Sequence, residues 1–358
     1  MSYNDAHSHR ASLSKCIYGC LGIALSLSAP LHAAEPLDSV LETVHPEIRK
    51  WASVIRVDSP TSTPTFTSYH YQGSEDAVDF WPASTIKLYT VIATLEWLNR
   101  QGFGIDTTLT FSHRSENGEG SEWVVDCART YSEMVSEVFR RSSNEDYTLL
   151  LRTLGIDAIN TKFLIPNKGF PHSALMRDYI TYRPAVYENN EDQRIQAISP
   201  SGIGKTFEHH WSGISYSKQR GASALSAETG NCTSTAELAN CLKRLLFHSQ
   251  IPTKERFDIT AAQAKWICEG DPKRGIVGLE NRLAGPYGWE DSGELVFPKA
   301  RYFHKAGLIS SYALDVCYLS DRESDQHLIL AIAAHSGEEG IIRDMALKIY
   351  QAANAGAL

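Results

Sequence analysis

The chain has 358 residues, of which 42% are hydrophobic and 21% are charged, and this composition is typical of a globular protein with a sizeable core. The formal net charge of -8 argues against a nucleic-acid partner, which would need a basic surface. The seven cysteines form no C-x-x-C pair and no Cys/His spacing of a metal site, so we expect neither a metal nor a cofactor.

Residues 1–34 predict a secretory signal peptide, because two basic residues precede the apolar run 16–31 and small residues follow it. The alternative is a membrane anchor, but the run is shorter than the ~20 apolar residues that a span needs, and Pro30 interrupts it. We therefore expect a periplasmic or secreted protein with no stable membrane span. The cysteines that remain after cleavage could form one or two disulfides in an oxidising compartment.

Apolar periodicity gives the expected elements in chain order. Helical spacing predicts helices over 37–49, from Ser84 to about 98, from the capping box 130–133 to about 140, and over 147–154, 234–246, 259–268 and 341–349. Runs with strand character are found at 51–58, 65–71, 107–111, 302–308, 312–319 and 327–334. The segment 164–231 is rich in Gly, Pro and Ser and has no sustained period, so we expect a long loop, either functional or a solvated insertion. Strands thus cluster at both ends of the chain, around a mainly helical middle.

Ser84 and Lys87 stand three residues apart where a long amphipathic helix begins. Residues at this spacing share a helix face, so the Lys87 amine can reach the Ser84 hydroxyl. A partly desolvated lysine can take the proton of a serine nucleophile, and a helix N-terminus favours an oxyanion. The alternative is a helix cap with a surface lysine. Two other Ser-x-x-Lys matches open no periodic helix; they are Ser12/Lys15 and Ser215/Lys218.

Two further motifs follow in the chain. Ser142-Ser143-Asn144 lies between two predicted helices, and Lys305-Ala306-Gly307 lies on a predicted strand. Each is weak alone, but Ser-x-x-Lys, Ser-x-Asn and Lys-x-Gly in this order and context resemble the active-site serine β-lactamases and penicillin-binding proteins. The resemblance is closest to the class A β-lactamase-like family.

The resemblance implies an α/β (α+β) fold of the β-lactamase/transpeptidase type. Such a fold has a five-stranded antiparallel sheet with flanking helices plus a helical subdomain, and the cleft lies between them. We expect one domain over 35–358, with a sheet subdomain of about 35–80 and 290–358 and a helical subdomain of about 81–289.

The resemblance also implies roles for the motif residues. Ser84 would be acylated, Lys87 would take its proton, and Ser142 would pass a proton to the leaving nitrogen. Substrate would be held by Asn144, Lys305, Gly307 and Ser310. The backbone N–H groups of Ser84 and Leu308 would form the oxyanion hole.

Two departures from the family pattern bear on turnover. Family enzymes deacylate with a glutamate that positions water four residues before an asparagine, and no such pair lies between Asn144 and Lys305. Ala306 stands where the family has a threonine hydroxyl, which Ser310 or Ser311 could replace. The long segment offers four glutamates without that asparagine and three aromatics that could cover the cleft: Glu188, Glu191, Glu208 and Glu228, and Phe207, Trp211 and Tyr216.

The leading hypothesis is a monomeric serine hydrolase that opens β-lactams or related amides and esters through an acyl-Ser84 intermediate. Its partner would be a small-molecule β-lactam or a cell-wall peptide. The alternatives are a D-alanyl-D-alanine peptidase or an esterase, and a penicillin-recognising protein that does not turn over.

Overall fold

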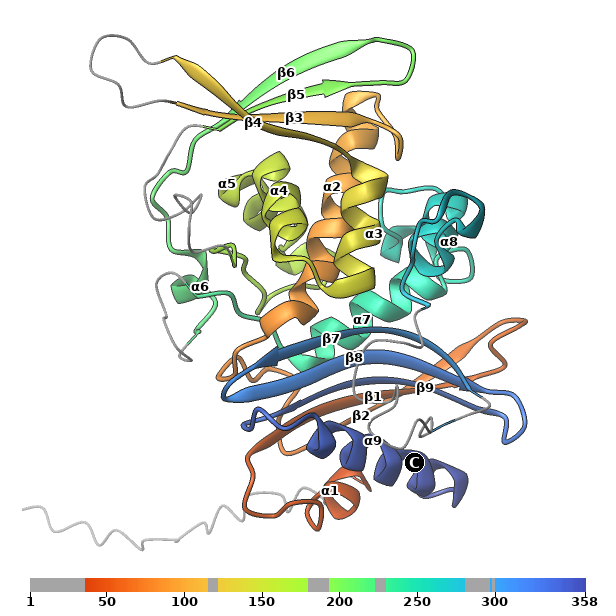
Figure 1. Ribbon diagram of the computed structural model, residues 1–358. Coiled ribbons are helices and arrows are strands. Elements are labelled where there is room, and N and C mark those ends of the chain that lie inside the picture. Colours follow the sequence, from red (N-terminus) through yellow and green to blue (C-terminus); the bar gives the residue numbers. More distant parts are fainter. Residues whose placement is uncertain (1–35, 115–121, 180–192, 223–229, 281–296, 298–299) are drawn as a thin grey trace, which may run out of the picture. The chain divides into compact units, whose positions relative to one another are not determined.

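Strands from both ends of the chain form one five-stranded antiparallel sheet, sheet A, in the order β2-β1-β9-β8-β7 (Figure 1). The computed structural model describes residues 36–114, 122–179, 193–222, 230–280, 297 and 300–358. The predicted signal peptide lies outside them. The strands of sheet A are β1 (Lys50–Asp58), β2 (Thr65–His70), β7 (Arg301–Ile309), β8 (Tyr312–Asp321) and β9 (Gln326–Ala334). The expected antiparallel sheet is therefore confirmed.

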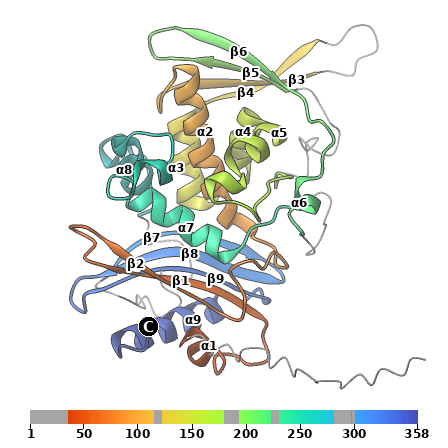
Figure 2. The ribbon, with the colours of Figure 1, turned by 180° about the vertical axis from the view of Figure 1, so that it is seen from behind.

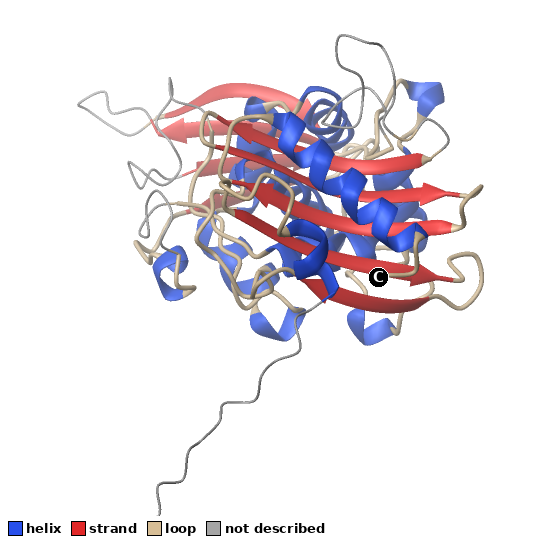
Figure 3. Ribbon diagram, turned by 90° about the horizontal axis from the view of Figure 1, so that it is seen from below, coloured by secondary structure: helices blue, strands red, loops and turns tan. Residues whose placement is uncertain are grey.

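Helices cover both faces of sheet A. Figure 3 shows α9 (Glu339–Asn354) lying across one face, and α1 (Pro36–Leu41) packs beside it. The other face carries the helical layer, in which α7 (Thr235–Leu246) lies next to the sheet (Figure 2). Because both faces are covered, almost every residue of β8 and β9 is buried, and their sequences are nearly continuous apolar runs. The remaining helices of this layer are α2 (Lys87–Gln101), α3 (Tyr131–Arg141), α4 (Asn144–Leu154) and α8 (Ala261–Glu269).

A second antiparallel sheet, sheet B, lies beyond the helical layer, in the order β4-β3-β5-β6 (Figure 1). Its strands are β3 (Thr108–Arg114), β4 (Trp123–Thr130), β5 (Gln193–Ile198) and β6 (Gly204–His209). Only β3 was expected, so the prediction of a loop without regular structure throughout 164–231 is wrong. This segment also contains the short helix α6 (Tyr216–Gln219). Leu109, Phe111 and Ile195 bury the inner face of sheet B in the main core, which also includes α2 and α4.

Local signals set several element ends. The capping box at Thr130 opens α3, as predicted. The Ser234 hydroxyl caps α7, but the Glu237 carboxylate accepts instead from the His172 amide and the Ser173 hydroxyl. The first helix ends at Leu41, eight residues earlier than predicted. The short α5 (Ile156–Ala158) follows α4.

No disulfide joins the cysteines of the described part of the chain, although the sequence allowed one or two. Cys241, Cys268 and Cys317 are buried in α7, α8 and β8, three separate elements. Burial raises the pKa of the Cys241 and Cys268 thiols above the ordinary range. Within the described residues, no helix is both long and apolar enough to cross a lipid bilayer.

Candidate active site

Ser84 lies in a short 3-10 turn, η1 (Ala83–Ile86), which runs directly into α2. The apolar side chains of α2 from Leu88 to Leu98 are buried, so the helix is fixed in the core and presents its N-terminus to the cleft. Ala83 has a φ of 44°, in the left-handed region that a residue with a Cβ rarely adopts. The turn that presents Ser84 is therefore strained, and its surroundings must hold it.

The Lys87 amine lies at the turn between α3 and α4. The Lys87 side chain is fully buried, and its Nζ donates to the Ser142 carbonyl oxygen and to Asn144 Oδ1, the latter at 2.6 Å. The Ser142 Oγ lies 3.3 Å from the same nitrogen. Ser142 adopts a φ of 56° as the C-cap of α3, and this left-handed residue separates the two helices. Lys87 thus connects the Ser-x-x-Lys and Ser-x-Asn motifs.

Burial changes the protonation of Lys87. Desolvation and the nearby Lys305 charge lower the pKa of Lys87 to about 6, against a smaller opposing effect of Asp146. The amine is therefore mostly neutral near pH 7. A neutral amine has two N–H bonds, and the carbonyl oxygens of Ser142 and Asn144 can accept both. The lone pair is then left to accept a proton.

Lys305, on β7 (Arg301–Ile309), also contacts Ser142. Its Nζ donates to Ser142 Oγ at 2.8 Å and to the Ala306 carbonyl oxygen at 2.7 Å. Desolvation lowers the pKa of Lys305 to about 8, while Asp315 on β8 opposes the shift. Lys305 thus remains largely protonated at neutral pH. Its donated hydrogen bond leaves the Ser142 hydroxyl proton free to move elsewhere.

Strand β7 lies against η1 at Gly307. A Cβ added to Gly307 would meet the Ser84 amide nitrogen at 2.9 Å and the Pro82 carbonyl oxygen at 3.1 Å, so only glycine fits without a shift. This close approach places the Leu308 backbone beside the Ser84 turn. Ser84 and Leu308, predicted to donate to one oxyanion, line the same cavity.

Five of the predicted residues line one cavity of about 380 Å³: Ser84, Ser142, Asn144, Lys305 and Leu308. Lys87 and Gly307 are not among the residues that line it, but Lys87 contacts Ser142 and Asn144, and Gly307 lies against the Ser84 turn. Ser310 and Ser311 instead line an adjoining hollow, which shares Leu308 with the first. Ala306, at the position where the family has a threonine hydroxyl, also lines the cavity. The cavity is lined by Ser84, Phe139, Arg141, Ser142, Asn144, His304, Lys305, Ala306, Leu308 and Glu339.

Sequence reasoning missed two residues that adjoin this site. Tyr179 donates to the Ala83 carbonyl oxygen at 2.7 Å, and the Asn231 amide lies 3.3 Å from the Tyr179 hydroxyl. Both belong to the segment 164–231, 52 residues apart in sequence. No local pattern distinguishes them, because their positions depend on how the two ends of that segment meet.

The other residues proposed from that segment lie elsewhere. Phe207 packs on Trp97 with ring centroids 4.6 Å apart, and Glu208 pairs with Arg194 on sheet B. Trp211 and Tyr216 also do not line the cavity, so none of the three aromatics covers it. Glu188, Glu191 and Glu228 lie outside the described residues.

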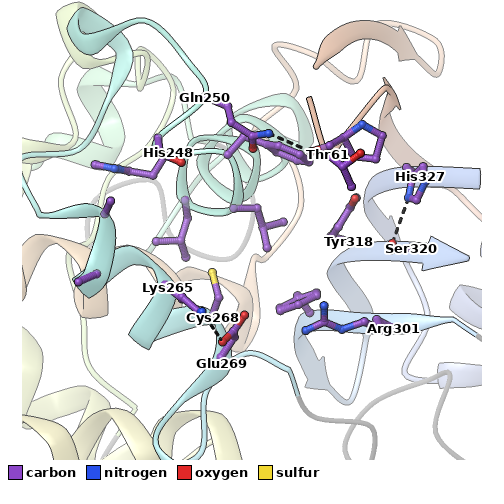
Figure 4. Close-up of a pocket in the computed structure, with 18 of the residues that line it drawn as sticks. Thr61, His248, Gln250, Lys265, Cys268, Glu269, Arg301, Tyr318, Ser320 and His327 are labelled. Carbon is purple, nitrogen blue, oxygen red and sulfur yellow. Dashed lines mark hydrogen bonds and ion pairs between the residues drawn. The ribbon is translucent and has the colours of Figure 1, made fainter. Parts of the chain in front are cut away.

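A larger cavity of about 530 Å³ lies between α7, α8 and β7–β9, and none of the predicted residues lines it (Figure 4). Three of its charged side chains are engaged within the protein: Arg301 pairs with Glu280 at 2.7 Å, and Lys265 with Glu269 at 3.7 Å. Ser84, Ser142 and Lys305 thus line the smaller cavity, and no predicted site residue lines the larger one.

Comparison with known proteins bears on the fold. No protein-family model and no curated protein sequence matches the chain. Solved structures do match: a β-lactamase from Sphaerobacter thermophilus DSM 20745 has a TM-score of 0.51 at 15% identity, over 90% of this chain and 96% of that one.

Two further solved structures agree. The TLA-1 extended-spectrum β-lactamase gives a TM-score of 0.53 at 13% identity, over 88% of this chain and 98% of that one. PBP-A, solved as a point mutant in an acyl-enzyme complex with penicillin G, gives a TM-score of 0.51 at 14% identity, over 89% of this chain and 96% of that one. The chain therefore has the β-lactamase-like fold, a mixed α/β architecture that it shares with β-lactamases and a penicillin-binding protein.

Proposed function

We propose that the chain is an active-site serine hydrolase that opens β-lactams or related amides and esters through an acyl-Ser84 intermediate. The observation that carries the proposal is the state of Lys87, a buried amine with a pKa of about 6, one helical turn from Ser84. A neutral lysine so placed can remove the serine proton as Ser84 attacks the substrate carbonyl.

The other motif residues take complementary roles in this proposal. The backbone N–H groups of Ser84 and Leu308 stabilise the oxyanion of the tetrahedral intermediate. Ser142 passes its proton to the leaving nitrogen, and Lys305, which donates to Ser142 Oγ, supplies positive potential. Asn144 fixes the Lys87 amine through Oδ1, and its amide group also holds the substrate.

The same acylation chemistry suits a D-alanyl-D-alanine peptidase or an esterase, whose leaving groups depart from the cavity. It also suits a penicillin-recognising protein that keeps its acyl group. One observation favours slow release: among the described residues that line the cavity, Glu339 is the one carboxylate, and it belongs to α9 rather than to the Lys87 side. The predicted signal peptide would place this activity in the periplasm or outside the cell.

The test is intact-mass spectrometry of the protein after it is mixed with penicillin G. We expect a mass increase of one penicillin per chain that decays slowly, and no increase in Ser84→Ala, since removing a nucleophile costs several orders of magnitude in rate. Ser215→Ala is the matched control, because Ser215 belongs to the other Ser-x-x-Lys in the mature chain and lines no part of the cavity.

The outcomes separate the candidates. Labelling that persists in Ser84→Ala would refute the assignment of the nucleophile. An adduct that forms and clears with steady turnover identifies a hydrolase, and a stable adduct identifies a penicillin-recognising protein. A burst of one product per chain followed by a slow phase would mean that deacylation limits the rate.

A further inference from the structure

The Tyr179 hydroxyl contacts the backbone immediately before the proposed nucleophile. Its Oη donates to the Ala83 carbonyl oxygen at 2.7 Å, and Ala83 is the residue with a φ of 44°. A left-handed alanine is held in place only when its surroundings over-determine it. A hydrogen bond to its carbonyl oxygen fixes the orientation of the peptide group that links Ala83 to Ser84.

The Tyr179 hydroxyl is itself held on both sides. It can accept from Asn231 Nδ2 at 3.3 Å and from Trp81 Nε1 at 3.4 Å, so its one donor and both acceptor sites are in use. Burial raises the pKa of Tyr179 to about 12, which keeps its proton in place at neutral pH. Such a hydroxyl is suited to hold a structure rather than to exchange protons.

Asn231 in turn fixes the stretch of chain that carries Tyr179. Its Oδ1 accepts from the Met176 and Arg177 amides at 2.7 and 3.0 Å, and its Nδ2 donates to the Arg177 carbonyl oxygen. Ala174 and Cys232 form an antiparallel bridge beside these contacts. The two ends of the long segment are thus joined next to the nucleophile turn.

The Tyr179 ring covers the Lys87 amine together with the ring of Tyr147. Both ring centroids lie 5.7 Å from Lys87 Nζ, and the two rings are 5.0 Å apart. The charged groups that also face Lys87 are Lys305 on β7 and Asp146 on α4. The two rings therefore exclude water from this side of the amine, where water would otherwise solvate its cation.

We propose that Tyr179 is the positioning residue of the Ser84–Lys87 pair. Its hydroxyl holds the strained turn at Ala83 that presents Ser84, and its ring keeps water away from the Lys87 amine. This inference rests on the proposed function for the roles of Ser84 and Lys87, but not for the geometry. It assigns a purpose to the junction of residues 174–179 with Asn231, which the motif residues alone leave unexplained.

The first experiment separates the hydroxyl from the ring. The Tyr179→Phe variant keeps the ring, so we expect acylation by a fluorescent penicillin to slow about tenfold, the scale of one hydrogen bond, with an unchanged pH midpoint. Tyr131→Phe is the matched control, since its hydroxyl also donates to a backbone carbonyl oxygen at 2.8 Å, that of Val91 in α2. Acylation of Tyr179→Phe at the parental rate would refute the role of the hydroxyl.

The second experiment needs no substrate. Lysine labelled with 13C at Cε reports the titration of Lys87 by NMR, with Lys87→Arg to assign the signal. We expect Tyr179→Ala to raise the midpoint from about 6 towards the ordinary 10.5, and Tyr179→Phe to leave it in place. An unchanged midpoint in Tyr179→Ala would refute the role of the ring, whether or not penicillin reacts.

Asn231→Ala is a second route to the same contact should Tyr179→Ala fail to fold. It removes one of the three partners of the Tyr179 hydroxyl and the hydrogen bonds that hold residues 176–177, so the Lys87 midpoint should rise and acylation should slow. If penicillin does not label the parent protein but the variants show these NMR shifts, the proposed function is overturned and this inference stands. If penicillin labels the parent but both variants keep the parental Lys87 midpoint, this inference is overturned and the proposed function stands.

Discussion

Two lysines with different protonation states share one serine hydroxyl in this site. Lys87 Nζ lies 3.3 Å and Lys305 Nζ 2.8 Å from Ser142 Oγ. Burial lowers the pKa of Lys87 to about 6 and that of Lys305 to about 8. Between these two pH values Lys87 is mostly neutral and Lys305 mostly charged, as a base and a source of positive potential require.

We expect the second-order rate constant of acylation to rise as pH increases through about 6, because Lys87 loses its proton, and to fall through about 8, because Lys305 loses its charge. Rates measured with a fluorescent penicillin from about pH 5 to about pH 10 will check this. Lys305→Arg keeps its charge at high pH, so only the alkaline limb should move. A shift of the acid limb in that variant would contradict the assignment of this limb to Lys87.

Lys87→Ala should slow acylation at least about a hundredfold, because it removes the proposed base. A smaller loss of acylation rate would show that another residue takes the proton.

The three motifs could be recognised in the sequence because each is local. Ser84 and Lys87 share one helix face, Ser142 and Asn144 flank one turn, and Lys305 lies on one strand, so spacing alone constrains them. The fold brings both lysines to the Ser142 hydroxyl, which lines one cavity with Ser84. Tyr179 and Asn231 could not be found this way, because an amide and a phenol joined across a long segment leave no periodic signal.

At the scale of elements, the contact of β7 with η1 sets the alignment of the two proposed oxyanion donors, the Ser84 and Leu308 amides. We expect Gly307→Ala to slow acylation at least about tenfold and to lower the free energy of unfolding by about 1–3 kcal/mol, since its Cβ would lie 2.9 Å from the Ser84 nitrogen. Acylation rates and chemical denaturation measure the two effects.

Gly204→Ala is the control for that substitution, since Gly204 is also a strand residue but its added Cβ would meet its nearest neighbour at 3.7 Å. It should acylate at the parental rate. Equal losses in the two variants would mean that the close approach of β7 is not what positions Ser84.

Sheet A was predictable and most of sheet B was not, for a physical reason. The strands β8 and β9 are buried on both faces and consist largely of apolar residues. In contrast β6 exposes most of its residues and β4 buries none fully, so neither strand carries a clear apolar alternation. These edge strands form because β4 can pair with β3 and β6 with β5. Such pairing joins distant parts of the chain, so the local sequence pattern does not reveal it.

For the molecule as a whole, the desolvated lysine that the proposed chemistry needs lowers the stability of the folded protein. The unfolded chain holds Lys87 at an ordinary pKa near 10.5, and the folded chain at about 6. Between these values only the unfolded state binds the proton, so this residue makes the free energy of unfolding rise with pH, by about 1.4 kcal/mol per unit at most. Below about pH 6 both states are protonated, and the folded state carries the full cost of a buried charge.

We therefore expect Lys87→Met to stabilise the protein most near pH 6 and progressively less towards pH 10, while acylation is lost. Urea denaturation of the parent and the variant at several pH values measures the difference, and Lys254→Met, at an exposed lysine, is the matched control for removing a lysine. A Lys87→Met variant that is less stable than the parent at pH 6 would mean that the hydrogen bonds to Ser142 and Asn144 outweigh the desolvation of the amine. In that case the lysine would be charged in the folded protein, and another group would have to take the proton of Ser84.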